Sequence, residues 1–223
     1  MTDDAELNAL IARAQDPSTS QDDRAELAKH VRPQVRAAVG ANPEGPPSLL
    51  IRLAKDEDKR VRAAVAANPT TPTAAVEELA YDEDWSVRAG AAANTAAGDF
   101  TLSELTRDDD VRVRAAAAAN RGLSAKDFKR CREDDDWRVR GAAAANPGAP
   151  EDALAKLSED RDWQVRAEVA GNELAALVLL RTLATDEDWR VRAAVASNPS
   201  APSEVLAALV ADSEPVVREL AVR

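Results

Sequence analysis

The hydrophobic positions along the chain recur at a fixed spacing. A Val-Arg pair returns every 26 residues, and an apolar residue stands eight positions before each of these valines. An asparagine follows each of the first seven valines after seven residues. The valines are Val35, Val61, Val87, Val113, Val139, Val165, Val191 and Val217. A constant period of this length indicates a repeat protein, in which one small motif is stacked on copies of itself.

Residues 56–81 show what one repeat contains. The segment "DEDKRVRAAVAAN" predicts a first helix that begins at Asp56 or Asp58 and ends at Asn68. The following "PTTP" predicts a turn, because two prolines interrupt a helix. The segment "TAAVEELA" predicts a second short helix, with Pro72 as its first residue. Each repeat therefore reads as two helices and a turn.

Helices this short are unstable alone and bury their apolar faces only against neighbouring repeats. The chain is therefore expected to be all-α, an α-solenoid of about seven to eight two-helix repeats of 26 residues, with helix over more than about two thirds of its length. Residues 1–15 read as an N-terminal capping helix, and residues 16–223 as one continuous solenoid domain. The last repeat ends within its first helix.

The repeat pattern resembles that of the leucine-rich repeat variant family. The segments "VRAAVAANPTTPTAAVEELAYDEDW" (61–85) and "VRAAVASNPSAP" (191–202) carry the resemblance best, and it extends from about residue 16 onward. It implies a right-handed superhelix of alternating short helices, one of them often 3₁₀. The family repeat is usually slightly shorter than the one here. Some members carry a cysteine-rich iron–sulfur segment, whereas this chain has the single cysteine Cys131.

Composition narrows the classes of partner. The chain has 29 Lys and Arg against 40 Asp and Glu, a net charge of −11. Nucleic-acid affinity comes largely from neutralising phosphates, so this balance disfavours nucleic acids and anionic membranes. The sequence contains no apolar run of the ~18 residues that a spanning helix needs. It also begins without the pattern of a signal peptide. A cytoplasmic location is expected.

Two acidic positions precede each first helix, five and three residues before the valine, as in "DEDW" at 82–85 and 186–189. A D-x-D pair supplies oxygens suited to Ca²⁺ or Mg²⁺, but the glycine and further ligands of a calcium loop are missing. Capping of the helix and interaction with its dipole explain the acids without a metal. We therefore expect a structural role and no metal site.

The arginine after each valine lies within the apolar arc of its helix and needs a charged partner. The acid three residues before the valine is the expected partner, at i, i+4 spacing, for example Asp162 for Arg166. The repeated asparagines are expected to bond the backbone of the turns.

The four tryptophans share one position, two residues before the valine, and are the candidate partner-binding residues. Two interpretations stay open: packing across the seam to the next repeat, or an aromatic ridge that a partner grips. Lys59 and Val111 occupy the same position in other repeats without disturbing the pattern. The tryptophans are Trp85, Trp137, Trp163 and Trp189.

No catalytic chemistry is apparent. Cys131 occupies a core leucine position, and the single histidine, His30, lies about four repeats away, which excludes a Cys/His dyad within one chain. The phosphate-binding, dinucleotide-binding and zinc-protease motifs are absent. The chain is predicted to be a non-enzyme without a cofactor.

The sequence thus predicts a scaffold that binds another protein. The third, fourth and sixth repeats lose the Asn-Pro turn ("NTAAGDF", "NRGLS", "NELAALV"), so the partner could also lie along these turns. The alternative is nucleic-acid binding by a HEAT-like protein, with a glycosylase-like site handling an extruded base, supported by Arg60, Arg112, Arg138 and Arg190. End-to-end self-association is a third hypothesis.

Overall fold

The computed structural model describes residues 2–222. The chain forms two compact units, Met1–Gly122 and Leu123–Arg223, here called the N-terminal and C-terminal units. Over the described residues, all regular secondary structure is α-helical. This confirms the all-α solenoid class. Helices cover slightly under two thirds of the chain, less than expected, because the second helix of each repeat is only seven residues long.

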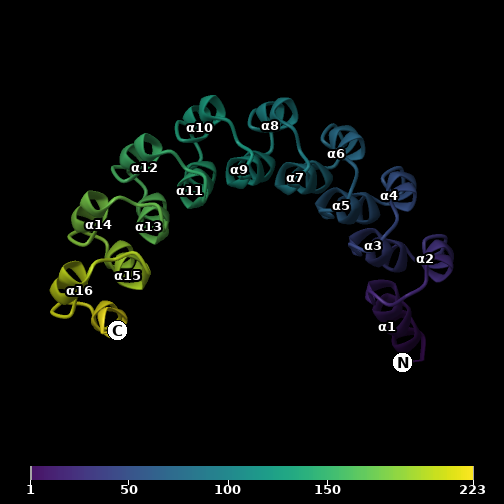
Figure 1. Ribbon diagram of the computed structural model, residues 1–223, viewed down its shortest axis with the longest axis horizontal. Coiled ribbons are helices and arrows are strands. Elements are labelled where there is room, and N and C mark those ends of the chain that lie inside the picture. Colours follow the sequence, from purple (N-terminus) through teal and green to yellow (C-terminus); the bar gives the residue numbers. More distant parts are fainter. Residues whose placement is uncertain (1, 223) are drawn as a thin grey trace. The chain divides into compact units, whose positions relative to one another are not determined.

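In the N-terminal unit, the first helices of successive repeats stand side by side in one row, and the second helices form another (Figure 1). The first row contains α1 (Thr2–Gln15), α3 (Pro33–Ala41), α5 (Lys59–Ala67), α7 (Trp85–Ala93) and α9 (Val111–Ala119). The second row contains α2 (Gln21–Leu27), α4 (Pro47–Leu53), α6 (Thr73–Leu79) and α8 (Asp99–Leu105).

The C-terminal unit repeats the same two rows. Its first helices are α11 (Trp137–Ala145), α13 (Trp163–Gly171), α15 (Trp189–Ser197) and α17 (Pro215–Ala221). Its second helices are α10 (Ala125–Cys131), α12 (Glu151–Leu157), α14 (Leu177–Leu183) and α16 (Ser203–Leu209). In both units, contact between first helices of successive repeats is the most extensive packing.

The ends of each helix follow from local sequence. In α5, Asp58 is the N-cap and its side chain accepts a hydrogen bond from the Arg60 N–H, while Asn68 is the C-cap. The second helix of that repeat begins at Thr73, with Pro72 as N-cap rather than as first helical residue. All second helices are α-helical rather than 3₁₀.

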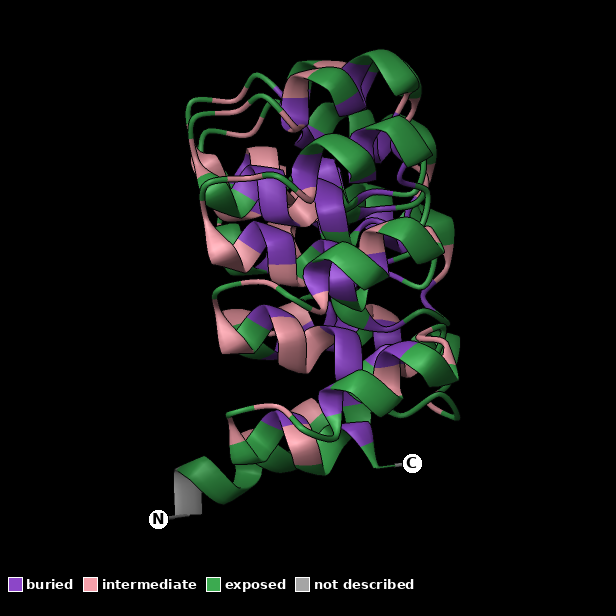
Figure 2. Ribbon diagram, turned by 90° about the vertical axis from the view of Figure 1, so that its left-hand side faces the viewer, coloured by how far each residue is buried: buried purple, intermediate pink, exposed green. Residues whose placement is uncertain are grey.

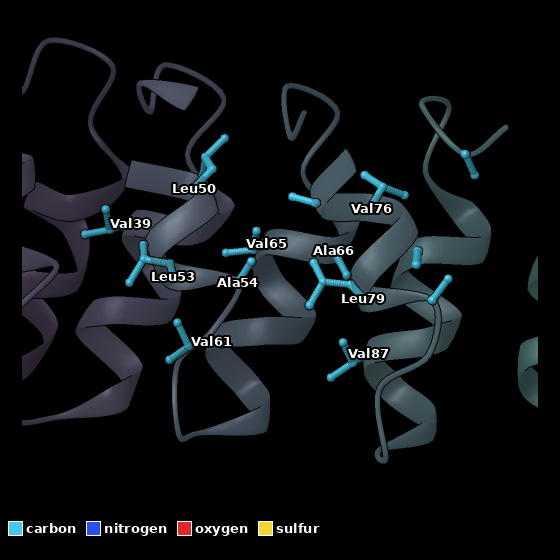
Figure 3. Close-up of a cluster of buried hydrophobic side chains, with 14 of the residues drawn as sticks. Val39, Leu50, Leu53, Ala54, Val61, Val65, Ala66, Val76, Leu79 and Val87 are labelled. Atoms are coloured by element: carbon cyan, nitrogen blue, oxygen red, sulfur yellow. The ribbon is translucent and has the colours of Figure 1, made fainter. Parts of the chain in front are cut away.

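The core lies between the two rows and between neighbouring first helices. The repeated valines are fully buried, and the leucines eight residues earlier are nearly so. In Figure 3, Leu50 and Leu53 of α4 and Val61 and Val65 of α5 belong to one such cluster. Figure 2 shows buried residues where helices face one another and exposed residues on the outward surfaces. Cys131 is buried as predicted, at 1% exposure.

Candidate partner-binding surfaces

The two acidic positions before each first helix have separate structural roles. The acid three residues before the valine caps the helix in most repeats, as Asp84 does for the Ser86 N–H at 2.9 Å. The acid five residues before the valine closes the preceding turn, since Asp82 accepts from the Asp84 N–H at 2.9 Å. These contacts confirm capping. The described residues contain no cluster of side chains suited to holding a metal ion.

The repeated arginine is largely buried and paired, as expected, but its predicted partner is wrong. Arg166 pairs with Asp186 of the next repeat, with Nε to Oδ2 at 2.7 Å and Nη2 to Oδ1 at 2.9 Å, and not with Asp162. Its Nη1 donates to the carbonyl of Asp160 at 2.8 Å. One arginine therefore links the segment before its own first helix to the corresponding segment of the following repeat.

This arrangement recurs within both units. The pairs that show bidentate geometry are Arg36–Asp56, Arg62–Asp82 and Arg88–Asp108 in the N-terminal unit, and Arg140–Asp160, Arg166–Asp186 and Arg192–Asp212 in the C-terminal unit. The hydrogen bond from Arg192 holds the pKa of Asp212 down at about 2. In Asp186, burial alone would raise the pKa, but the bonds from Arg166 and from the Asp188 N–H keep it below its ordinary value.

The asparagines form a second set of links between repeats. The Asn172 Nδ2 donates to the carbonyls of Ala144 and Asn146 in the previous repeat, at 2.7 and 3.1 Å. Its Oδ1 accepts from the Leu174 N–H at 2.9 Å. The backbone-bonding role predicted for these residues is confirmed.

The turns that lack the Asn-Pro sequence keep the same geometry. The Ala97 N–H donates to the Asn94 carbonyl at 3.1 Å, as the Thr71 N–H does to Asn68 at 3.0 Å in a regular repeat. What distinguishes the turn of the sixth repeat is its surface, where the apolar residues Leu174, Leu177 and Val178 are exposed. Proline is therefore dispensable in the turn.

Each tryptophan is the first residue of its helix and is partly exposed. Trp85 and Trp137 are each 37% exposed, and Trp163 and Trp189 are intermediate. In the N-terminal unit, the Arg112 guanidinium carbon of a later repeat lies 3.4 Å from the centroid of the Trp85 ring. The tryptophan rings therefore contact residues of a neighbouring repeat and are also partly exposed to solvent.

The C-terminal unit places three tryptophans on successive helices. The Arg190 guanidinium lies 4.7 Å from the Trp163 ring and 5.0 Å from that of Trp189, and Arg138 lies 5.3 Å from Trp137. These five residues, at the beginnings of α11, α13 and α15, are here called the tryptophan edge.

The arginines one residue before the repeated valine are not free cations. Arg60, Arg112, Arg138 and Arg190 each pair with the capping acid two residues earlier. The acid that neutralises each of them is the one three residues before the valine.

His30 and Cys131, the two residues considered for catalysis, have contacts that serve the fold. His30 Nδ1 accepts from the Arg32 N–H at 3.1 Å, and Cys131 lies in the core. None of the described helices combines the length and the apolar character needed to cross a membrane.

Comparisons with known proteins point to one family. The Leucine Rich Repeat Variant domain model matches residues 8–67, and the Leucine rich repeat variant model matches residues 60–84, 137–162 and 189–214. A solved structure described as a leucine-rich repeat variant with a novel repetitive structural motif is 28% identical, with a TM-score of 0.57. The match covers 89% of this chain and 78% of that one.

More remote similarities were also found. Escherichia coli YibA is 16% identical with a TM-score of 0.40, over 86% of this chain and 74% of that one. A designed armadillo repeat protein is 16% identical with a TM-score of 0.29, over 96% of this chain and 95% of that one. The comparison with curated proteins gave no match.

Proposed function

Because the chain belongs to the leucine-rich repeat variant family, we propose that it is a non-catalytic scaffold that binds another protein. We assign the contact to the tryptophan edge of the C-terminal unit. The observation that carries this assignment is a row of large aromatic side chains that the fold does not require.

In the N-terminal unit, two repeats form the same fold without a tryptophan at this position. Lys59 and Val111 occupy the tryptophan position at the beginnings of α5 and α9, and both helices have the same nine-residue length as α7. Lys59 replaces the ring contact with an ion pair to Asp84 at 2.8 Å. Seam packing alone therefore does not account for three tryptophans in succession.

The chemistry of the edge suits a protein interface. Tryptophan and arginine are the residues that most often dominate binding energy, and a ring held beneath a guanidinium loses little freedom on binding. Exposed acids, including Asp135 and Glu187, flank the edge. The expected partner therefore presents an apolar centre surrounded by basic residues.

Nucleic-acid binding has weaker support. Arg60, Arg112, Arg138 and Arg190 are each paired with an aspartate, so binding phosphate would require breaking those pairs. A mobility-shift assay over a salt series separates the two functions. Binding to duplex or single-stranded DNA or RNA that weakens steeply with salt would favour the nucleic-acid function.

The test of the proposed function is capture of a partner from the native cell by tagged protein. Trp137→Ala should remove the captured protein, whereas Val178→Ala, which alters a still more exposed apolar residue on α14, should leave it in place. The reverse result would move the partner face to the irregular turn of the sixth repeat. Retention by both variants would refute both locations.

A further inference from the structure

We propose that Glu168, on α13, receives an arginine side chain of the protein partner. The site would be a hollow between α13 and α15, lined by residues of these two helices and by Asn198, which follows α15. This inference rests on the proposed scaffold function and deepens it by adding a contact with stated chemistry.

Glu168 is an exception at its position in the repeat. Three residues after each valine, six of the other seven repeats have a small uncharged residue, and the last has Leu220. The small residues are Ala38, Ala64, Gly90, Ala116, Ala142 and Ala194. A glutamate at this position is therefore not needed to build the repeat.

The surroundings of Glu168 leave room for a ligand. A hollow of about 360 Å³ is lined by Ala167, Glu168, Gly171, Ala194, Ser197 and Asn198. Its walls are small side chains, and a Cβ added at Gly171 would meet no atom within 4 Å. On the other side, a Cβ at Gly141 of α11 would lie 3.8 Å from the Glu168 Cγ. A partner could therefore approach close to the helix backbone here.

Glu168 is an exposed residue, and its carboxylate has no hydrogen-bond or ion-pair partner among the described residues. The helices on either side partly desolvate the carboxylate, which raises its pKa above the ordinary value. The arginines of the three nearest repeats are already engaged: Arg140 with Asp160, Arg166 with Asp186, and Arg192 with Asp212. An accessible carboxylate that borders a hollow and has no partner within the described residues is complementary to a cation from outside the chain.

Arginine fits this site better than lysine. A guanidinium is less strongly hydrated than an ammonium group and can donate two parallel hydrogen bonds to one carboxylate. The small residues around Glu168 leave space for the flat group beside the carboxylate.

The experiment uses ¹⁵N-labelled full-length protein and two capped seven-residue Ala/Ser peptides. One has a central arginine and the other has citrulline, which keeps the shape and removes the charge. We expect the arginine peptide to shift the amide signals of Ala167, Gly171, Ala194 and Ser197 in a saturable way. The citrulline peptide should shift them at least several-fold less. Equal shifts with both peptides, or none with the arginine peptide at millimolar concentration, would overturn the proposal.

The variants Glu168→Gln and Glu168→Ala should abolish the arginine-specific shifts, while the control Glu173→Gln should retain them. The alanine variant carries the residue found in most repeats, so its melting temperature should not fall. Shifts retained in both Glu168 variants would contradict the site. A lysine peptide that binds more tightly than the arginine peptide would also contradict the choice of arginine.

This outcome is separable from that of the scaffold function. If Trp137→Ala abolishes partner capture but Glu168→Gln does not, and no arginine-specific shift occurs, the scaffold function stands and the Glu168 site fails. If no partner is captured by the wild type, the scaffold function fails whatever the peptides show.

Discussion

At the scale of single residues, the repeated arginine is the most informative position. Arg62 uses Nε and Nη2 on Asp82 of the next repeat and Nη1 on the carbonyls of Asp56 and Glu57 in its own turn. Helical periodicity correctly places the arginine on the buried side of its helix. A buried guanidinium needs a carboxylate partner, so the sequence also predicts that one lies nearby. It suggests the wrong carboxylate, because Asp58 is already oriented toward the Arg60 N–H as a helix cap. Pairing across repeats cannot be read from one repeat alone.

Removing one such arginine should be costly. Arg166→Ala leaves Asp186 buried without its cation, so we expect a loss of about 3 kcal/mol of unfolding free energy. Arg166→Lys should recover only part of this loss, because an ammonium group cannot reproduce the bidentate contact. The control Arg161→Ala removes a side chain that is 76% exposed and should cost under about 1 kcal/mol. Urea unfolding measures all three, and equal losses for Arg166→Ala and Arg161→Ala would show that the link is not stabilising.

At the scale of elements, the turn between the two helices is defined by its asparagine rather than by its prolines. Asn94 and Asn172 are followed by Thr95 and Glu173 instead of proline, yet both donate to two carbonyls of the preceding repeat. The sequence predicts the backbone-bonding role of the asparagines and most helix ends, because these residues recur in successive repeats. It does not predict that the asparagine side chain reaches the carbonyls of the preceding repeat.

Asn172→Ala should therefore destabilise the C-terminal unit. The change leaves the carbonyls of Ala144 and Asn146 without their side-chain donor in a buried position, and we expect a loss of about 2–4 kcal/mol. Hydrogen exchange should show reduced protection in α11 and α13. Asn8→Ala, at an exposed position of α1, is the matched control and should change stability by less than about 0.5 kcal/mol. A similarly small effect for Asn172→Ala would mean that water replaces the link.

At the scale of the whole molecule, the 26-residue period predicts the architecture but not which surface residues bind a partner. The fold follows from the valine, leucine and asparagine positions because they are buried or bonded in every repeat. Glu168 is not found in that way, since it lies on a surface whose other residues are small. Comparing the residues three positions after each valine could have found it.

Stability should depend on pH through the repeated aspartates. The pKa values of Asp58 and Asp212 are lowered to about 2, chiefly by the hydrogen bonds from Arg60 and Arg192 respectively. Acids with a lowered folded pKa contribute stability above their unfolded pKa of about 4, and lose it as pH falls through the folded pKa. The urea midpoint should therefore fall between about pH 4 and pH 2. An unchanged midpoint over that interval would contradict the role of these carboxylates.

The claim that the tryptophan edge binds a protein is tested most directly by photo-cross-linking in the native cell. A photoreactive phenylalanine analogue placed at residue 137, at the beginning of α11, is compared with the same analogue at residue 178 of α14. Val178 is more exposed than Trp137, so residue 178 has at least as much opportunity to react. We predict a discrete protein adduct from residue 137 and none from residue 178. An adduct from residue 178 alone, or from neither position, would contradict the claim.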